Sequence, residues 1–241
     1  MDDAGHLPVS LDEVLELLVP ALRQGSAGGE RVIVDCTVGY GGHAEALLEA
    51  SAGKAMLIGI DLDESALLKT RRRLARFGRR VRLFQANFAE VQAVMEEASV
   101  KSADAVLADL GVSSGQLQDA SRGFSFSTDG PLDMRMDCSS GPTAAELVNT
   151  LGQKELADLI YTYGQERYSR EIAAAIVRAR KVAAITRTSE LSEIITRVVA
   201  RKSRGRWRIH PATRTFQALR IAVNRELDNL SKLLEVLGGL L

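Results

Sequence analysis

The chain has 241 residues, of which 46% are hydrophobic and 26% are charged. These are ordinary values for a globular protein, so global disorder, a collagen helix and a coiled coil are excluded. No apolar run approaches the roughly 18 residues of a membrane span, and acidic residues follow Met1 where an export signal would be basic. With only two cysteines, Cys36 and Cys138, a disulfide framework and a structural zinc site are unsupported, and we expect a cytoplasmic protein.

The charge is balanced overall but unevenly placed along the chain. Basic and acidic residues number 31 each. Residues 69–82 contain eight basic residues and no acid, and residues 201–225 contain another eight and no acid. Because binding depends on local patches, a net charge of zero does not exclude a polyanionic partner.

The first half of the chain alternates between short apolar runs and helical patterns. A capping box at residues 10–13 opens an amphipathic helix that continues through Leu22. The predicted strands are residues 32–38, 56–61, 81–86 and 105–110. The predicted helices between them are residues 44–50, 63–77 and 89–98, the second capped by Asp63. Nearly continuous apolar strands that alternate with helices indicate an α/β fold with a parallel sheet covered on both faces.

The second half has a different pattern. Residues 111–142 are rich in glycine, serine, aspartate and methionine and show no clear period. A span of that length without regular structure is unusual for a connection and is typically functional. The chain then becomes helical, with predicted helices at residues 144–149, 154–163, 166–181, 190–201 and 213–237. We therefore expect an α/β domain with a helical insertion after the fourth strand.

A glycine-rich loop lies where the first strand turns into a helix. Gly39, Gly41 and Gly42 let the backbone turn tightly and approach a ligand closely. Asp61 ends the next strand, where its carboxylate can accept hydrogen bonds from both ribose hydroxyls of an adenosine moiety. The residues thus predict a site for an adenosine-containing cofactor.

Two cofactors fit this loop. Gly39-x-Gly41-x-x-Ala44 satisfies the dinucleotide pattern, so a nicotinamide-dependent oxidoreductase is one reading. Two carboxylates favour S-adenosylmethionine instead. Asp35, just before the glycines, can orient the loop and the amino-acid end of that ligand, and Asp109 closes the fourth strand where a reactive methyl group would lie. A glycine turn that binds no ligand is the third reading.

Two further residues near this edge have alternative interpretations. Phe88, after the third strand, can stack on an adenine or pack in the core. His43 at a helix start is more often a local hydrogen-bonding residue than a catalyst. No metal-ligand spacing surrounds it, so we predict no metal.

Four segments resemble the bacterial 16S ribosomal RNA cytosine-N4 methyltransferases that act on the decoding centre of the small subunit. They are residues 35–43, 109–114, 122–137 and 210–220, and the last two are long and specific. The resemblance implies a Rossmann-like, S-adenosylmethionine-dependent methyltransferase. It also implies that the following residues contact the cofactor: Gly41, Gly42, His43, Asp61, Phe88, Asp109 and Gln116.

The resemblance also implies a domain organisation. Residues 1–111 and 210–241 would form the methyltransferase domain, and residues 112–209 an inserted helical domain that helps to hold the RNA. Members of this family continue past Leu241, so the last strands of the sheet are expected to be missing. The fourth strand would then be an exposed edge, which predicts marginal stability or self-association, for instance as a homodimer. A fragment that binds cofactor and RNA but is catalytically impaired is therefore an alternative to an active enzyme.

The chemistry of the target suggests one catalytic role. The N4 lone pair of cytosine is delocalised into the ring, so an acceptor for the N–H would localise it and later take the proton. Asp109 is the predicted acceptor. Many amino-methyltransferases carry an Asp/Asn-Pro-Pro-aromatic motif here and this chain does not, so only the resemblance indicates the N4 target.

The two basic runs are interpreted differently. The run at residues 69–82 lies on a helix that leads away from the ligand edge, so a solvated face is favoured. The second run is interpreted as phosphate contacts with Trp207 as a stacking platform, and the alternative is a solvated linker with Trp207 in the core. The predicted RNA contacts are Arg204, Arg206, Trp207, Arg208, His210, Arg214 and Arg220.

The loop before the helical region carries further charged residues. Asp129, Asp133, Arg135 and Asp137 can form pairs that stabilise turns. They can also close over the target base, which must leave its stack to reach such a pocket. The residues themselves favour turns, whereas the resemblance favours RNA contacts by Asp133 and Arg135.

Overall fold

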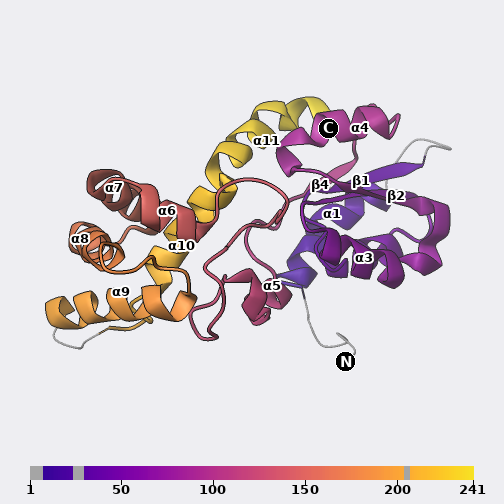
Figure 1. The fold of residues 1–241 in the computed structure, drawn as a ribbon. Coiled ribbons are helices and arrows are strands. Elements are labelled where there is room, and N and C mark those ends of the chain that lie inside the picture. Colours follow the sequence, from indigo (N-terminus) through magenta and orange to yellow (C-terminus); the bar gives the residue numbers. More distant parts are fainter. Residues whose placement is uncertain (1–7, 24–29, 204–206) are drawn as a thin grey trace. The chain divides into compact units, whose positions relative to one another are not determined.

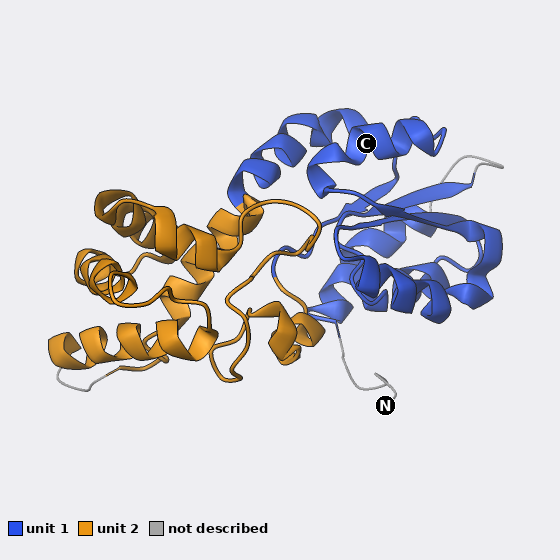
Figure 2. Cartoon of the chain, in the orientation of Figure 1, with its two compact units in different colours: residues 1–111, 227–241 blue, residues 112–226 orange. Residues whose placement is uncertain are grey.

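The computed structural model describes residues 8–23, 30–203 and 207–241 (Figure 1). Two compact units divide the chain (Figure 2). Unit 1 comprises Met1–Gly111 and Leu227–Leu241, and unit 2 comprises Val112–Glu226. The sequence analysis has the methyltransferase domain resume at residue 210, whereas unit 1 resumes at Leu227. The division into a methyltransferase domain and an RNA-holding insertion stays a prediction. No helix among the described residues is long and apolar enough to cross a membrane.

Unit 1 is built on a parallel sheet with the strand order β3-β2-β1-β4. Its strands are β1 (Arg31–Asp35), β2 (Ala55–Asp61), β3 (Val81–Gln85) and β4 (Ala105–Leu107). Ile33 of the central strand β1 is in register with Leu57 on one side and with Ala105 on the other. The predicted α/β fold, Rossmann-like with a parallel sheet, is confirmed. β1 and β4 end three residues earlier than expected because the chain turns into loops there.

Helices cover both faces of this sheet (Figure 1). They are α1 (Leu11–Arg23), α2 (Gly42–Ala50), α3 (Glu64–Arg73), α4 (Val91–Glu97) and α11 (Glu226–Leu240). Alternate strand residues point to opposite faces. Ile33 therefore packs with α1, α2 and α3, whereas Val34 packs with α4 and α11. The amide of Ala103 donates a hydrogen bond of 2.6 Å to the Leu240 carbonyl oxygen, which ties the end of α11 to the approach of β4.

Unit 2 is helical and has its own core. Its helices are α5 (Ser114–Gln118), α6 (Ala144–Thr150), α7 (Gln153–Gly164), α8 (Ser169–Arg180), α9 (Thr188–Ser203) and α10 (Thr213–Asn224). Ile160, Ile176 and Phe216 meet in the core. A Cβ at Gly164 would lie 2.3 Å from the Arg214 carbonyl oxygen, so only glycine allows α7 and α10 to approach this closely. The helical character of this region is confirmed.

Three details of the sequence prediction were wrong. The helix expected over residues 213–237 is broken at Arg225, which has a left-handed φ of 50°. The helix expected to reach residue 77 ends at Arg73, and a 3-10 segment, η1 (Ala75–Arg80), follows it with a kink at Gly78, which adopts φ 57°, ψ −125°. Residues 111–142 contain two short capped turns, α5 and η3 (Ala120–Arg122), where no regular structure was expected.

Candidate functional site

The glycine loop after β1 is shaped by backbone conformations that favour glycine. Gly39 and Gly41 have φ values of 49° and 79°, and Gly41 caps the start of α2. A Cβ at Gly41 would lie 3.0 Å from the Thr70 methyl carbon, and a Cβ at Gly42 would lie 2.6 Å from Pro8. The loop therefore packs tightly on its protein side. Among the described residues, a Cβ at Gly39 would meet only the Thr37 carbonyl oxygen, at 3.7 Å, which leaves that side open for close approach by a ligand.

Two side chains from neighbouring elements hold this loop in place. One Asp61 oxygen accepts a hydrogen bond of 2.8 Å from the Gly39 amide, and the other accepts one of 2.9 Å from the Asp63 amide. The fully buried Thr70, on α3, donates its hydroxyl hydrogen to the Gly39 carbonyl oxygen. Both peptide groups that flank Gly39 are thereby fixed, so the loop is ordered in advance of any ligand.

Asp35 is buried at the end of β1, and the pKa of its carboxyl is raised. Its Oδ1 accepts a hydrogen bond of 3.1 Å from the Thr37 amide. Burial raises the pKa of this carboxyl to about 7; the Thr37 bond opposes the rise, while the Asp61 and Asp109 carboxylates add to it. The neighbouring Cys36 thiol is buried too, and burial with the adjacent Asp35 raises its pKa to about 12, so it is not a nucleophile near neutral pH.

Asp109 follows β4 and is exposed to solvent. Its backbone amide donates a hydrogen bond of 2.7 Å to the Thr37 hydroxyl, which joins the loops after β1 and β4. The Cys36 amide donates a hydrogen bond of 2.8 Å to the Leu107 carbonyl oxygen, a second contact between the segments that follow β1 and end β4. Three carboxylates thus gather at the carboxyl ends of β1, β2 and β4, the edge where open α/β sheets bind their ligands.

These residues fit a cationic, adenosine-containing ligand such as S-adenosylmethionine. Asp35, Asp61 and Asp109 raise the local negative potential, and a bound ammonium or sulfonium group would relieve it. Asp61 keeps acceptor capacity for ribose hydroxyls, since a carboxylate has about four lone-pair sites and the backbone amides of Gly39, Asp63 and Leu62 take at most three of them. The open side of Gly39 supplies the close backbone approach that such a ligand needs.

The other predicted cofactor residues are placed as follows. Phe88 follows β3 and is half-buried against the α4 side of the core, so stacking and packing are both open to it. His43 is buried, and its Nε2 donates a hydrogen bond of 2.9 Å to the Val9 carbonyl oxygen. Gln116 belongs to unit 2, where its side chain caps α5 by accepting from the Ser113 amide at 3.0 Å. Its contact with a cofactor stays a prediction.

In unit 2, charged residues of the loop before the helices form ion pairs. Arg135 donates hydrogen bonds to both carboxylate oxygens of Asp133, at 2.8 and 2.9 Å. Burial acts to raise the pKa of the Asp133 carboxyl, but the hydrogen bonds from Arg135 outweigh it and hold that pKa below its usual range. Asp129 pairs instead with Arg187 at 2.6 Å, a residue 58 positions away that directly precedes α9. The Asp133–Arg135 pair accords with the interpretation as a turn-stabilising pair, whereas Asp129 ties the loop to a distant helix start.

His210 begins the segment at residues 210–220 and stacks on an aromatic ring. Its imidazole lies parallel to the Phe126 ring at 4.3 Å with an interplanar angle of 11°, and Phe126 meets Phe216 edge-on at 5.4 Å. His210 Nδ1 accepts a hydrogen bond from the Ala212 amide at 3.2 Å, so the other ring nitrogen carries the proton in neutral histidine. The ring is thereby oriented while its outer edge stays exposed.

The predicted phosphate-binding arginines differ in what they contact. Arg220 forms a two-pronged ion pair with Glu226 at 2.7 and 2.9 Å and is mostly buried. Arg214 donates to the Gln165 carbonyl oxygen at 3.2 Å and is exposed. Arg208 and Trp207 are exposed, the latter by 45%. Arg204 and Arg206 lie outside the described residues.

Sequence reasoning missed two positioning residues, Thr37 and Thr70. Neither belongs to a recognisable motif, and a threonine on a strand end or helix has many uses. Only the pairing of β1 with β4, and the packing of α3 on the glycine loop, give these hydroxyls their partners. Among the described residues no group of three or more histidine, cysteine, aspartate or glutamate side chains could hold a metal ion.

Comparison with known proteins gives consistent relatives. Residues 3–241 match the model of the MraW methylase family. Ribosomal RNA small subunit methyltransferase H of Geotalea uraniireducens is 50% identical over 236 residues, which cover 97% of this chain and 72% of that protein. The proteins of the same name from Geobacter sulfurreducens and Syntrophobacter fumaroxidans are 52% and 49% identical, over 98% and 95% of this chain and 73% and 69% of their own lengths.

Proposed function

The chain belongs to the MraW methylase family, and on this premise we propose that it transfers a methyl group from S-adenosylmethionine to the N4 amine of a cytosine in the decoding centre of 16S ribosomal RNA. The methylase activity follows from the family. The RNA substrate is supported by the printed name of the relatives, small subunit ribosomal RNA methyltransferase. An enzyme with that substrate would act where ribosomes assemble, in the cytoplasm.

The observation that carries the proposal is the group of three carboxylates beside the glycine loop. S-adenosylmethionine supplies an electrophilic methyl group on a sulfonium sulfur. Asp61 would accept hydrogen bonds from the ribose, and Asp35 would pair with the ammonium of the amino-acid end. The backbone from Gly39 to Gly42 would lie against the ligand, with Phe88, His43 and Gln116 as the further contacts that the family pattern implies.

Asp109 is the residue that we assign to proton transfer. Its carboxylate is exposed at the end of β4, while its backbone is held by Thr37, so its position is fixed and its oxygens are accessible. Accepting a hydrogen bond from the N4 amine would localise the nitrogen lone pair toward the methyl group. After transfer the same carboxylate would take the surplus proton.

Unit 2 supplies the proposed RNA contacts. Trp207 is 45% exposed, which favours a stacking platform over a core residue. Arg208 and Arg214 are exposed cations on the same segment. We also propose that residues 112–209 act as the RNA-holding insertion and residues 210–241 return to the methyltransferase domain. Arg204 and Arg206 complete the proposed set of phosphate contacts.

One experiment distinguishes an active methyltransferase from a catalytically impaired fragment that binds cofactor and RNA. Purified protein, labelled S-adenosylmethionine and small ribosomal subunits lacking the modification are incubated, and the RNA is digested to nucleosides. Label in N4-methylcytidine is the expected result. Cofactor binding without transfer would instead identify a binding protein that has lost catalysis. The nicotinamide reading has no support from the family, and NADH fluorescence that stays unchanged on mixing would agree with its dismissal.

A further inference from the structure

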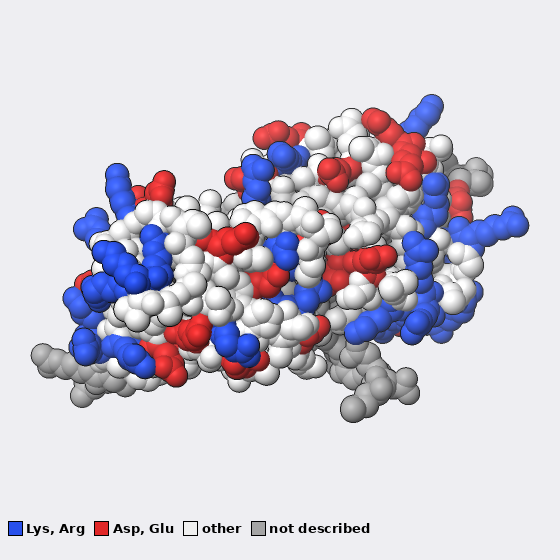
Figure 3. Space-filling view, viewed as in Figure 1, with Lys and Arg blue, Asp and Glu red and all other residues white. Residues whose placement is uncertain are grey.

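A basic face of unit 1 takes no part in the proposed reaction. The eight basic residues of the run at 69–82 lie on α3, on η1 and at the start of β3. In Figure 3 blue side chains gather at the lower right of the molecule, over unit 1. We call this the α3–η1 face. The sequence favoured a solvated helix face here, and the side-chain contacts allow that interpretation to be refined.

Not all of these cations are available to a partner. Five of them already contact other groups of the chain: Lys69, Arg73, Arg76, Arg80 and Arg82. Arg71, Arg72 and Arg79 are exposed and have no ionic or hydrogen-bonding partner among the described residues. Glu45 and Glu49 neutralise only the charge of Arg73 and Arg76. The face therefore presents three guanidinium groups outward, with more positive charge behind them.

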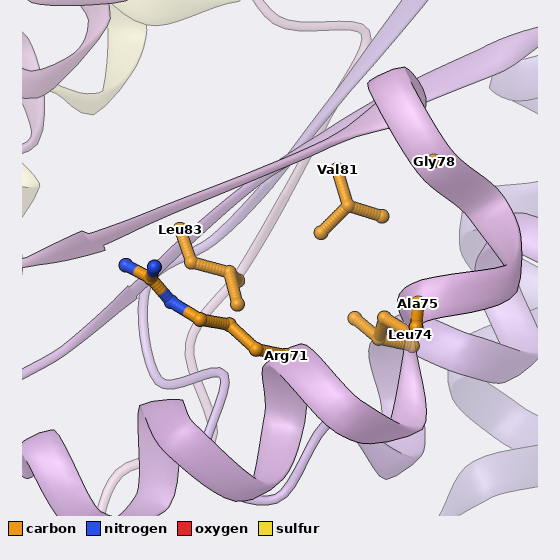
Figure 4. Close-up of a pocket in the computed structure, with 6 residues that line it drawn as sticks. All are labelled: Arg71, Leu74, Ala75, Gly78, Val81 and Leu83. Carbon is orange, nitrogen blue, oxygen red and sulfur yellow. The ribbon is translucent and has the colours of Figure 1, made fainter.

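A hollow adjoins Arg71. It has a volume of about 240 Å³ and lies between the end of α3, η1 and the edge strand β3 (Figure 4). Leu74, Val81 and Leu83 give it aliphatic walls, and the Arg71 side chain lies alongside. Gly78 adds no side chain, and its φ of 57° favours glycine there. Aliphatic walls beside a guanidinium plane suit a flat, unstacked base.

We propose that the α3–η1 face binds a stretch of the substrate RNA other than the target nucleotide, with phosphates on Arg72 and Arg79 and an unstacked base in the hollow against Arg71. The inference rests on the proposed function, since ribosomal RNA provides both groups. The guanidinium fork matches phosphate oxygens and also stacks on bases, and seven of the eight cations are arginines. An acidic protein would need no flat hollow beside the charges.

The position of the face determines which RNA can reach it. α3 leads away from the carboxyl end of β2, and its ten residues span about 15 Å. The packed side of the same helix contacts the glycine loop, because Lys69 lies over the Tyr40 ring and Arg73 donates a hydrogen bond to the Tyr40 carbonyl oxygen. The α3–η1 face is therefore the outward side of an element that borders this loop. RNA bound there would belong to the same substrate as the target nucleotide but would not enter the loop itself.

The test compares two double variants of the full chain. Arg72→Gln with Arg79→Gln removes the proposed phosphate contacts, and Lys101→Gln with Lys232→Gln removes two exposed cations of unit 1 elsewhere. Binding to small subunits lacking the modification is measured across salt concentrations. The arginine pair should flatten the slope of log affinity against log salt by about 1.4, as expected for two single-strand phosphates. The lysine pair should leave that slope unchanged.

A third variant tests the hollow separately. Ala75→Leu fills it without changing charge. Loss of one stacked base should weaken binding between about fivefold and 150-fold, with the salt slope unchanged. Cofactor affinity and melting temperature, measured for every variant, show that each one folds.

The outcomes separate this inference from the function on which it rests. If the unchanged protein neither binds nor methylates the subunit, the proposed function fails and the inference fails with it. If the unchanged protein binds and methylates, while the arginine pair gives the same slope as the lysine pair, the inference alone is overturned. The face would then be a solvated surface or a site for another polyanion.

Discussion

The Asp109 backbone amide donates a hydrogen bond of 2.7 Å to the Thr37 hydroxyl. The two residues are 72 positions apart in sequence and follow the adjacent strands β1 and β4. The cofactor loop and the proposed proton acceptor are therefore mechanically connected. A disturbance of Thr37 should reach the chemistry through Asp109, although Thr37 itself transfers no proton.

Thr37→Val should lower the rate of methyl transfer. The change keeps the side-chain shape and removes the acceptor, and a hydrogen bond of this kind contributes about 1 kcal/mol, or roughly a fivefold effect. We expect kcat to fall by about that factor with little change in melting temperature, because water can reach the exposed Asp109 segment. Thr37→Ser restores the hydroxyl and should behave like the unchanged protein. Equal kcat for all three proteins would contradict a positioning role.

The sequence was informative where local pattern decides structure. Asp63 caps its helix as expected, and the alternation of apolar runs predicted the sheet. It failed where a tertiary contact overrides propensity. At the end of α10 the Asn224 side chain bonds the Met134 carbonyl oxygen and the Met136 amide, at 2.8 and 2.7 Å. These partners lie about 90 residues away, so no local pattern predicts the break at Arg225.

The candidate site divides in the same way. Its carboxylates and glycines lie directly after predicted strands, so their approximate positions followed from the sheet. Which partner each side chain contacts could not be predicted from the sheet. Arg220 was predicted to contact phosphate, yet two of its three guanidinium nitrogens, Nε and Nη2, donate to Glu226 six residues later in the chain. Whether a cation on a helix is solvated or paired depends on the turn that follows, and that turn exists only because α10 ends at Asn224.

Gly41→Ala should lose cofactor affinity, and Gly53→Ala is its matched control. The two glycines have similar φ values, 79° and 83°, so alanine should cost about 1–2 kcal/mol of stability at either position. Only at Gly41 does the new Cβ press on Thr70, within the loop that would hold the cofactor. Calorimetric titration with S-adenosylmethionine should therefore show weakened binding for the first variant alone. Similar affinities for both variants would separate this loop from the cofactor.

Asp35→Asn should change how stability depends on pH. In the unfolded chain an aspartate titrates near about 3.9, whereas burial raises the pKa of Asp35 to about 7 in the folded protein. Between roughly pH 4 and pH 7 the unfolded state has lost a proton that the folded state keeps. The free energy of unfolding therefore falls with rising pH in this window. Asparagine lacks the effect, so the variant should gain stability relative to the unchanged protein by at most about 4 kcal/mol.

Urea unfolding at pH 4, 5.5, 7 and 8.5 would measure that difference. It should grow up to about pH 7 and then level off. A difference that stays constant over the whole range would show that Asp35 is ionised in the folded protein at all of these values. The cofactor gives an independent check, because its ammonium should favour the ionised carboxylate. Affinity should then rise with pH in the unchanged protein and stay flat in the variant.

Asp109→Asn should abolish most of the turnover while the cofactor still binds. Asparagine keeps the backbone bond to Thr37 but cannot take a proton, and general-base catalysis typically contributes about 10²–10⁴-fold. Single-turnover transfer with saturating cofactor would measure the loss. Asp158→Asn removes an exposed carboxylate on α7 and should leave the rate unchanged. Full turnover by the Asp109 variant would mean that another group or water accepts the proton.

Arg208 and Arg220 should respond differently to the same substitution. Arg208→Gln removes an exposed cation, so it should flatten the salt dependence of RNA binding by about 0.7 and leave stability unchanged. Arg220→Gln leaves Glu226, which is only 15% exposed, without its charged partner. That loss should lower the free energy of unfolding by about 1–3 kcal/mol, with an unchanged salt slope. If Arg220→Gln instead flattened the slope at constant stability, the RNA would have to displace Glu226 and take over the guanidinium, and the ion pair would be a feature of the RNA-free state only.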